Sequence, residues 1–432
     1  MTMTTTRRSI LGLTAGLMSM TGMIGLAMAQ QTTITFFTGN DEATVAISER
    51  LVADFEAANP DINVEIEIGP GGTERDNLVK TRLATGTMND VFLYNSGSLF
   101  QALNPAQALV DLTNEPWQAD VQNSFKQVVT APDGTVRGAP IQNAMGGGFF
   151  YNIPIYEELG LSVPTTWEEF MANNAAIAEA GEAAPVIQTY TDTWTSQIIF
   201  LADYFNVQVN DPDFARRYTV GEAKFATDPN AIRSFEKLGE IAQAGYLNED
   251  YGAAVLADGL RMVATGEGAH YPMLTFALAT IAQNYPDNID DVGFFAVPGD
   301  SDEMNGLTIW LPNGIYIPQS SPNVEAAKRF VAFVASVEGC ESQVAAGSVT
   351  GPFLVNGCEL PADVPRAVAD MLPYFEADRT APALEFLSPI KGPALEQITV
   401  EIGSGTRSAA DGAALYDEDV RKQAQQLGLP GW

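Results

Sequence analysis

The sequence has little of the chemistry on which most enzymes depend. Its 432 residues include one histidine, His270, and two cysteines. Nucleophilic triads, zinc sites and Cys-x-x-Cys redox centres need more of these residues at closer spacing. No Gly-x-Ser-x-Gly or Gly-x-x-x-x-Gly-Lys-Ser/Thr motif is present. We therefore expect no metal, no organic cofactor and no enzymatic activity, and we expect His270 to be structural.

Positive charge is also scarce. The chain has 22 Lys and Arg against 54 Asp and Glu, a formal net charge of −32. Phosphate backbones and anionic membrane surfaces attract basic proteins, so a nucleic acid or a membrane surface is excluded as a partner. The acidity itself is interpreted as solvated surface charge.

The longest apolar, charge-free run covers residues 10–26, too few for the ~20 that cross a bilayer. It follows Arg7 and Arg8 and ends in Ala27-Met28-Ala29, the pattern of an export signal that is cleaved after Ala29. The paired arginines fit a twin-arginine signal as well as an ordinary one. We expect a periplasmic protein that is not inserted in the membrane.

The two cysteines, Cys340 and Cys358, both lie in the exported part of the chain. Because the destination is oxidising, we predict a disulfide between them, with two free thiols as the alternative.

Roughly 400 residues follow the signal, enough for two globular units of about 100–200 residues each. The β-rich run 33–37 precedes a helical pattern over 47–58, and residues 62–68 then alternate between apolar and polar. This order is typical of βαβ units, which predict an α/β fold with mostly parallel sheets flanked by helices. No repeat or low-complexity linker separates the units, so we expect two lobes joined by several chain crossings.

Short motifs occur in a fixed order along nearly the whole mature chain. They include Asn59-Pro60-Asp61, Leu83-Ala84-Thr85-Gly86, Pro164-Thr165-Thr166-Trp167, Thr265-Gly266-Glu267-Gly268 and Ser320-Ser321-Pro322-Asn323. In this order they resemble the extracellular solute-binding proteins of ATP-driven (ABC) importers, specifically the sugar-binding group that includes maltose-binding protein.

The resemblance implies two lobes that close on a ligand held between the carboxyl edges of their sheets. Gly146-Gly147-Gly148 suits the first crossing as a hinge, because glycine tolerates large backbone changes, and a rigid glycine turn is the alternative. The implied boundaries are 30–142 plus 293–318 for the first lobe and 146–291 plus 320–432 for the second, with crossings near 142–146, 291–293 and 316–320.

The resemblance also places polar ligand contacts in the loop 40–42 and an aromatic residue after the strand 90–93. Counting from Gly266-Glu267 places a second aromatic at Phe276, with Tyr271 as its alternative. Where maltose-binding protein has charged residues, this chain has Gly97 and Ser98, which argues against a maltodextrin ligand.

A sugar presents flat C–H faces and a rim of hydroxyls, so its receptor needs aromatic planes and planar hydrogen-bonding groups. The segment 188–194 combines two aromatics with such groups, and Trp310 is a further candidate platform. The candidate ligand-binding residues are Asn40, Asp41, Glu42, Tyr94, Asn95, Gln142, Asn143, Tyr190, Asp192, Trp194, Tyr271, Phe276 and Trp310.

The predicted function is that of a monomeric, non-enzymatic binding component, which captures a carbohydrate and delivers it to an ABC permease. The alternatives are a receptor for a polyamine, an osmolyte or a glycerol-phosphate-like polyol, and a secreted enzyme that hydrolyses glycosides with two carboxylates. The candidate loops contain no arginine for a phosphate. A cation would fit an aromatic cage of Tyr190, Asp192 and Trp194.

Overall fold

The first sheet is built from alternating strands and helices at the start of the chain. The computed structural model describes residues 31–347 and 349–432, and the predicted signal segment lies outside them. β1 (Thr32–Thr38) leads into α1 (Glu42–Ala58), which Asp41 caps by accepting a hydrogen bond from the Thr44 amide at 2.9 Å. β2 (Ile62–Ile68), β3 (Val91–Tyr94), β4 (Gly138–Ile141) and β10 (Asn313–Tyr316) complete the sheet, in the order β2-β1-β3-β10-β4.

The second sheet is organised around one long strand, β5 (Met145–Asn152). β5 runs antiparallel to β7, β8 and β9, whereas β1 is parallel to both of its neighbours. Fewer strands are parallel than the sequence predicts. β5 runs away from the first sheet, whereas its neighbours β7, β8 and β9 run toward the first sheet. The other strands are β6 (Ala184–Val186), β7 (Gly268–Leu274), β8 (Val292–Ala296), β9 (Leu307–Trp310) and β11 (Thr380–Pro382).

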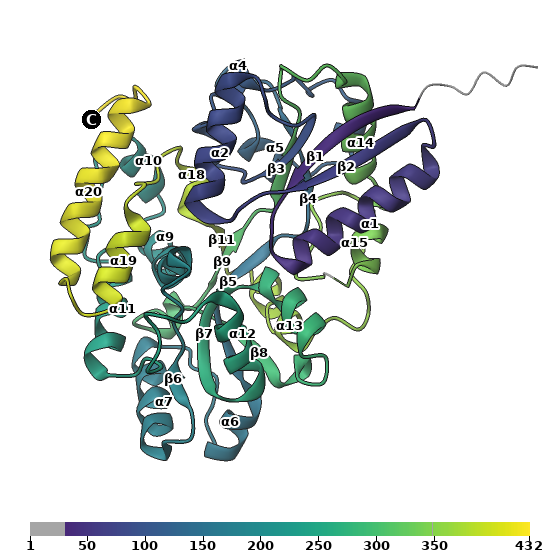
Figure 1. Ribbon diagram of the computed structural model, residues 1–432. Helices are drawn as coiled ribbons and strands as arrows, with labels where there is room; N and C mark the ends of the chain where they lie inside the picture. The colour runs from purple at the N-terminus through teal and green to yellow at the C-terminus, as the bar shows by residue number, and fades with distance from the viewer. Residues whose placement is uncertain (1–30, 348) are drawn as a thin grey trace, which may run out of the picture.

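Helices flank both sheets, as Figure 1 shows, and each lobe has its own hydrophobic core. This confirms the predicted two-lobed α/β fold. The first lobe also contains α2 (Gly72–Thr85), α3 (Ser98–Gln101), α4 (Pro105–Ala108), η1 (Pro116–Ala119), α5 (Asn123–Val128), α14 (Val324–Val334) and α15 (Val337–Ala345). The second contains α6 (Ile153–Leu159), α7 (Trp167–Ala180), η2 (Thr193–Gln197), α8 (Ile198–Ala202), α9 (Tyr204–Asn210), α10 (Phe214–Thr219), α11 (Arg233–Ala244), α12 (Leu256–Thr265), η3 (Thr275–Ala277), α13 (Leu278–Asn284), η4 (Ile289–Asp291), η5 (Asp302–Met304), α16 (Arg366–Ala369), α17 (Leu372–Glu376), α18 (Leu384–Leu387), α19 (Leu395–Gly403) and α20 (Ala409–Gln426).

Two of the three expected crossings lie elsewhere. The chain first passes between the sheets at residues 142–144, inside the expected range 142–146. β8 pairs with β5 in the second sheet, so the chain does not cross at 291–293; it crosses between β9 and β10, at residues 311–312. α14 and α15 then pack on the first lobe's core, so the chain does not cross back to the second lobe at 316–320. It crosses back in the long connection between α15 and α16, residues 349–365. Residues 293–310 therefore belong to the second lobe, and residues 324–345 belong to the first.

The glycine run lies inside β5 and is not a flexible turn. Gly146, Gly147 and Gly148 are all buried. A Cβ on Gly147 would lie 2.2 Å from the Trp310 ring, and one on Gly148 would lie 2.2 Å from the Phe295 carbonyl oxygen. These glycines therefore allow close packing of neighbouring groups, which corrects their expected role as a hinge.

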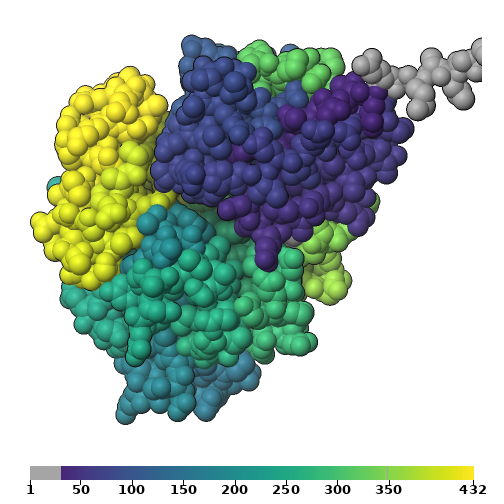
Figure 2. Space-filling view, viewed as in Figure 1, coloured from purple at the N-terminus to yellow at the C-terminus, as the bar shows by residue number. Residues whose placement is uncertain are grey.

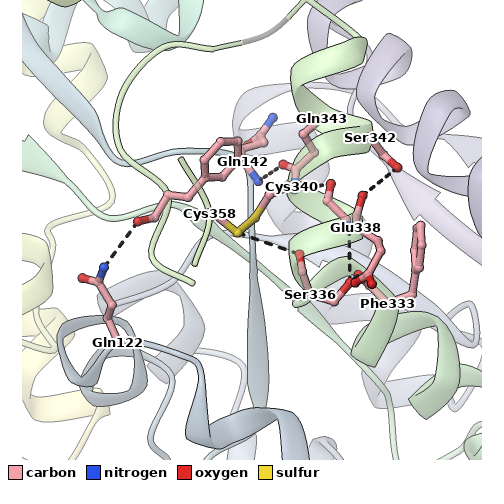
Figure 3. Close-up of a disulfide and its surroundings, with 11 residues drawn as sticks. Gln122, Gln142, Phe333, Ser336, Glu338, Cys340, Ser342, Gln343 and Cys358 are labelled. Atoms are coloured by element: carbon pink, nitrogen blue, oxygen red, sulfur yellow. Dashed lines mark hydrogen bonds between the residues drawn. A yellow bond between two sulfur atoms is a disulfide. The ribbon is translucent and has the colours of Figure 1, made fainter. Parts of the chain in front are cut away.

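The predicted disulfide between Cys340 and Cys358 is present (Figure 3). It ties the long connection to α15 in the first lobe. Phe353 and Val355 pack beside Cys340, and the Gln122 side chain donates a hydrogen bond to the Phe353 carbonyl at 3.4 Å. The connection is thus held to the first lobe before it reaches the second.

His270 is a structural residue of the second core. Its ring lies 2.7 Å from the Tyr156 hydroxyl and 2.8 Å from the Pro185 carbonyl, with no exposed surface. Burial lowers the pKa of His270 to about 3, so the ring is neutral at physiological pH.

Candidate functional site

The two lobes touch at two places on either side of their junction. On one side, Asn284 of α13 donates a hydrogen bond to Glu42 of α1 at 2.8 Å. On the other, α3 lies against α18, where Gly97 faces the backbone of Glu385. Figure 2 shows the seam along which the purple and blue residues of the first lobe meet the teal residues of the second.

The loop after β1 contributes one free side chain and two that are engaged. Asn40 is exposed, whereas the Asp41 carboxylate caps α1 and Glu42 bonds Asn284 across the junction. Of the three residues, Asn40 is the one left to offer its side chain to a ligand.

A buried polar group lies behind the loop that follows β3. Tyr94 has no exposed surface and donates its hydroxyl to Asp76 at 2.9 Å, while Asn95 is exposed. Burial raises the pKa of Asp76. Arg75 donates to the Leu93 carbonyl at 2.7 Å, and its buried Nε has no hydrogen-bond partner. The sequence analysis did not select Arg75 and Asp76, although the preceding Gly71-Gly72 pair marks the start of α2 at this edge.

Gln142 and Asn143 hold the chain passages together. The Gln142 side chain donates to Thr44 and accepts from Asn313, both at 2.8 Å. Asn143 is buried and accepts from the Thr350 amide at 3.4 Å. Both residues lie at the junction, but their polar groups mainly form hydrogen bonds within the protein, which leaves them less free to bind a ligand.

The second lobe brings two of the predicted aromatic residues together. The Trp194 and Phe276 rings lie 6.1 Å apart, inclined by 38°, and both are half-buried. Phe276 directly follows Thr275, whose hydroxyl accepts a hydrogen bond from the Gly146 amide beside the first passage. The aromatic pair, Trp194 and Phe276, therefore lies at the end of the second lobe where the passages begin.

Trp310 lies in β9, on the other side of β5 from β7, and is largely buried. Its indole N–H donates to Glu385 at 2.5 Å, and Lys391 is 3.7 Å from the same carboxylate. The positive charge of Lys391 also lowers the pKa of Asp76 in the first lobe, against the larger effect of burial. The Trp310 indole is therefore engaged within the second lobe by Glu385, which lies beside Lys391.

Three of the predicted ligand-binding residues are buried or hydrogen-bonded within the second lobe. Tyr271 is fully buried, with its hydroxyl 2.7 Å from that of Thr189, so Phe276 is the better-placed alternative. Asp192 accepts from the Leu256 amide at 2.7 Å, and Tyr190 is buried under α19. The cage of Tyr190, Asp192 and Trp194 that would suit a cation is not formed.

A separate cavity of about 530 Å³ lies beside the other end of β5. Its charged groups are paired within the chain: Arg379 donates to the Asn305 and Glu303 carbonyls at 2.5 and 2.8 Å, and Arg366 pairs with Asp370 at 2.8 Å. We therefore place the candidate ligand site at the lobe junction.

In residues 31–347 and 349–432, no group of three or more His, Cys, Asp or Glu is placed to hold a metal ion. No helix in the same part of the chain combines the length and apolarity that a bilayer crossing requires.

Two α/β lobes joined by three connections are the architecture of a two-lobed binding protein. The chain belongs to the family of bacterial extracellular solute-binding proteins, whose family model matches residues 39–339. This is a family of exported binding proteins and not of enzymes.

The relatives agree with this membership. The chain is 24% identical over 344 residues to the multiple sugar-binding protein of Streptococcus mutans, covering 77% of this chain and 78% of that one. A chitin oligosaccharide binding protein matches with a TM-score of 0.78 and 21% identity, and the solute-binding protein RafE in complex with raffinose matches with 0.73 and 22%. Each of these structures covers 92% of this chain, and all of the solved chain is matched. They confirm the two-lobed fold.

Proposed function

We propose that the protein binds a carbohydrate between its lobes in the periplasm and delivers it to the permease of an ABC importer. The observation that carries the proposal is the Trp194 and Phe276 pair at the lobe junction. Tilted, half-exposed rings can contact the C–H face of a sugar, while Asn40 and Asn95 on the first lobe can bond its hydroxyls.

The names of the relatives support the same ligand class. The curated relative is a multiple sugar-binding protein, and the structural neighbours include proteins described with chitin oligosaccharides, raffinose and stachyose. Export, with cleavage after Ala29, brings a monomeric protein to the compartment where such a ligand enters the cell.

Isothermal titration of the purified mature protein against raffinose, stachyose and triacetylchitotriose tests the proposal. We expect saturable binding of at least one saccharide. Replacing Trp194 by alanine should weaken binding by roughly ten- to a thousandfold, because stacking and burial of one aromatic is worth a few kcal/mol.

Trp432 provides a matched control, since it is half-buried and lies against Tyr218, close to the carboxyl end of the second lobe. Trp432→Ala should leave the saccharide affinity unchanged. Absence of binding to all three saccharides, combined with tight binding of a polyamine or an osmolyte, would overturn the carbohydrate assignment.

A further inference from the structure

The hydroxyl of Thr275 joins parts of the molecule that are far apart in sequence. It accepts a hydrogen bond from the Gly146 amide at 3.0 Å and donates one to the Thr350 carbonyl at 2.8 Å. Gly146 follows the first passage, and Thr350 begins the long connection between the lobes. Thr275 has no exposed surface, and the next residue is Phe276. One buried side chain therefore fixes the segment that carries Phe276, one ring of the aromatic pair, to two of the three connections.

These two connections are also bound to each other. The Ala144 amide donates to the Pro352 carbonyl at 2.8 Å, and a Cβ on Gly351 would lie 2.0 Å from the Ala144 carbonyl oxygen. The backbones of the two segments therefore pack closely against each other at this point. A movement of the first passage therefore displaces the long connection as well.

The first lobe holds the same pair of connections from its side. The Gln142 amide donates to the Gln343 side chain of α15 at 2.7 Å, as Figure 3 shows. The Cys340–Cys358 disulfide fixes the long connection to the same helix. A rotation of the first lobe is thus transmitted through α15 to residues 142–144 and 350–352, and from there to Thr275.

We infer that Thr275 is a positioning residue that couples lobe closure to the placement of the Trp194 and Phe276 pair. The inference rests on the proposed function, because it assigns the pair to the ligand. A hydroxyl group can accept from one backbone group and donate to the other at the same time. An apolar side chain of the same shape leaves both buried groups without a partner, so η3 is released from the connections.

Two substitutions at Thr275 and one control test the inference. Thr275→Val keeps the shape and removes both hydrogen bonds, whereas Thr275→Ser keeps the hydroxyl. Thr308 is the matched control: it is also fully buried, accepts from the Phe205 amide at 2.9 Å and donates to the Ala202 carbonyl at 2.6 Å. Both of its partners lie within the second lobe, so Thr308→Val loses two hydrogen bonds of the same kind, neither of which involves a connection between the lobes.

The first measurement needs no ligand. Hydrogen exchange should become faster in Thr275→Val at three separate segments, 144–147, 275–278 and 350–351, and should stay as in the wild type at all three in Thr308→Val. Thr275→Ser should behave as the wild type. Faster exchange confined to residues 275–278 in Thr275→Val would overturn the coupling.

The second measurement is titration with raffinose, stachyose and triacetylchitotriose. Thr275→Val should bind at least tenfold more weakly than the wild type, while Thr275→Ser and Thr308→Val stay within threefold. Equal losses in Thr275→Val and Thr308→Val would reduce Thr275 to a general stability role. If the wild type binds no saccharide, the proposed function fails, and the exchange experiment still decides the coupling.

Discussion

Gly97 is the position where one added methyl group tests the contact between the lobes. Its φ is 72°, and a Cβ there would lie 2.6 Å from the Glu385 carbonyl oxygen and 2.8 Å from the Phe386 ring of the second lobe. Ordinary contacts begin at 3.4 Å, so Gly97→Ala must separate α3 from α18 by about 0.8 Å. The substitution should therefore oppose the closed arrangement of the lobes.

Gly134 is a control for positive φ without a clash between the lobes. It also has positive φ, 83°, but nothing lies within 4 Å of its Cβ position. Alanine is strained at positive φ, and more so at Gly97, where ψ is −136° and the conformation is open essentially to glycine alone. Both substitutions should thus lower the free energy of unfolding, Gly97→Ala by more, and the clash across the junction should occur in Gly97→Ala alone.

We expect Gly97→Ala to weaken saccharide binding at least tenfold, equivalent to about 1.4 kcal/mol less favourable closure. Gly134→Ala should bind within twofold of the wild type. Titration measures the affinity, and small-angle scattering should show a larger radius of gyration for ligand-saturated Gly97→Ala than for the ligand-saturated wild type. Equal affinities and equal radii in the two variants would show that ligand binding does not require the α3–α18 contact.

Three further outcomes follow from the structure. Reversible urea unfolding should show that the double substitution Cys340→Ser with Cys358→Ser removes about 3 kcal/mol of stability, since the disulfide closes a loop with a sequence separation of 18; an unchanged midpoint would contradict this. His270 is neutral when folded, with a pKa of about 3, but takes up a proton near pH 6.5 when unfolded, so acidification favours unfolding. Unfolding at pH 7 and 5 should show the wild type losing about 2 kcal/mol relative to His270→Gln, and parallel pH profiles would refute the shift. The indole fluorescence of the wild type should change on saccharide addition, and Trp194→Ala should lose most of that change; retention would remove Trp194 from the site.

Periodicity and motif order predicted the class of fold but not the lobe to which each strand belongs. The run Val292–Ala296 is apolar throughout, so its pattern fits a buried strand in either sheet. The sheet to which this strand belongs is decided by its long-range pairing with β5, which a single sequence does not reveal. The glycine run was misinterpreted for a similar reason, because close approach to Trp310 and flexibility favour the same residue type.

Among the candidate site residues, those that follow a strand remain accessible, whereas those within a strand or at a helix start are engaged inside the protein. Phe276 follows β7 and remains half-exposed, whereas Tyr271 lies inside β7 and points into the core. Asp192 was chosen as a hydrogen-bonding group, but the free amide at the start of α12 takes its carboxylate. Arg75 was missed because a charged residue at the start of a helix is usually solvated.

The contacts beside the junction have a consequence for how such a protein diverges. Glu42–Asn284 and Gly97–Glu385 join lobe to lobe. If they contribute only to the free energy of closing, a substitution there multiplies the dissociation constants of all ligands by one factor and preserves their ranking. Substitutions at Trp194 or Phe276 act on individual ligands and reorder the ranking. Binding strength can therefore drift separately from ligand choice, adjusting the protein to scarce or abundant nutrients without changing which nutrient it takes.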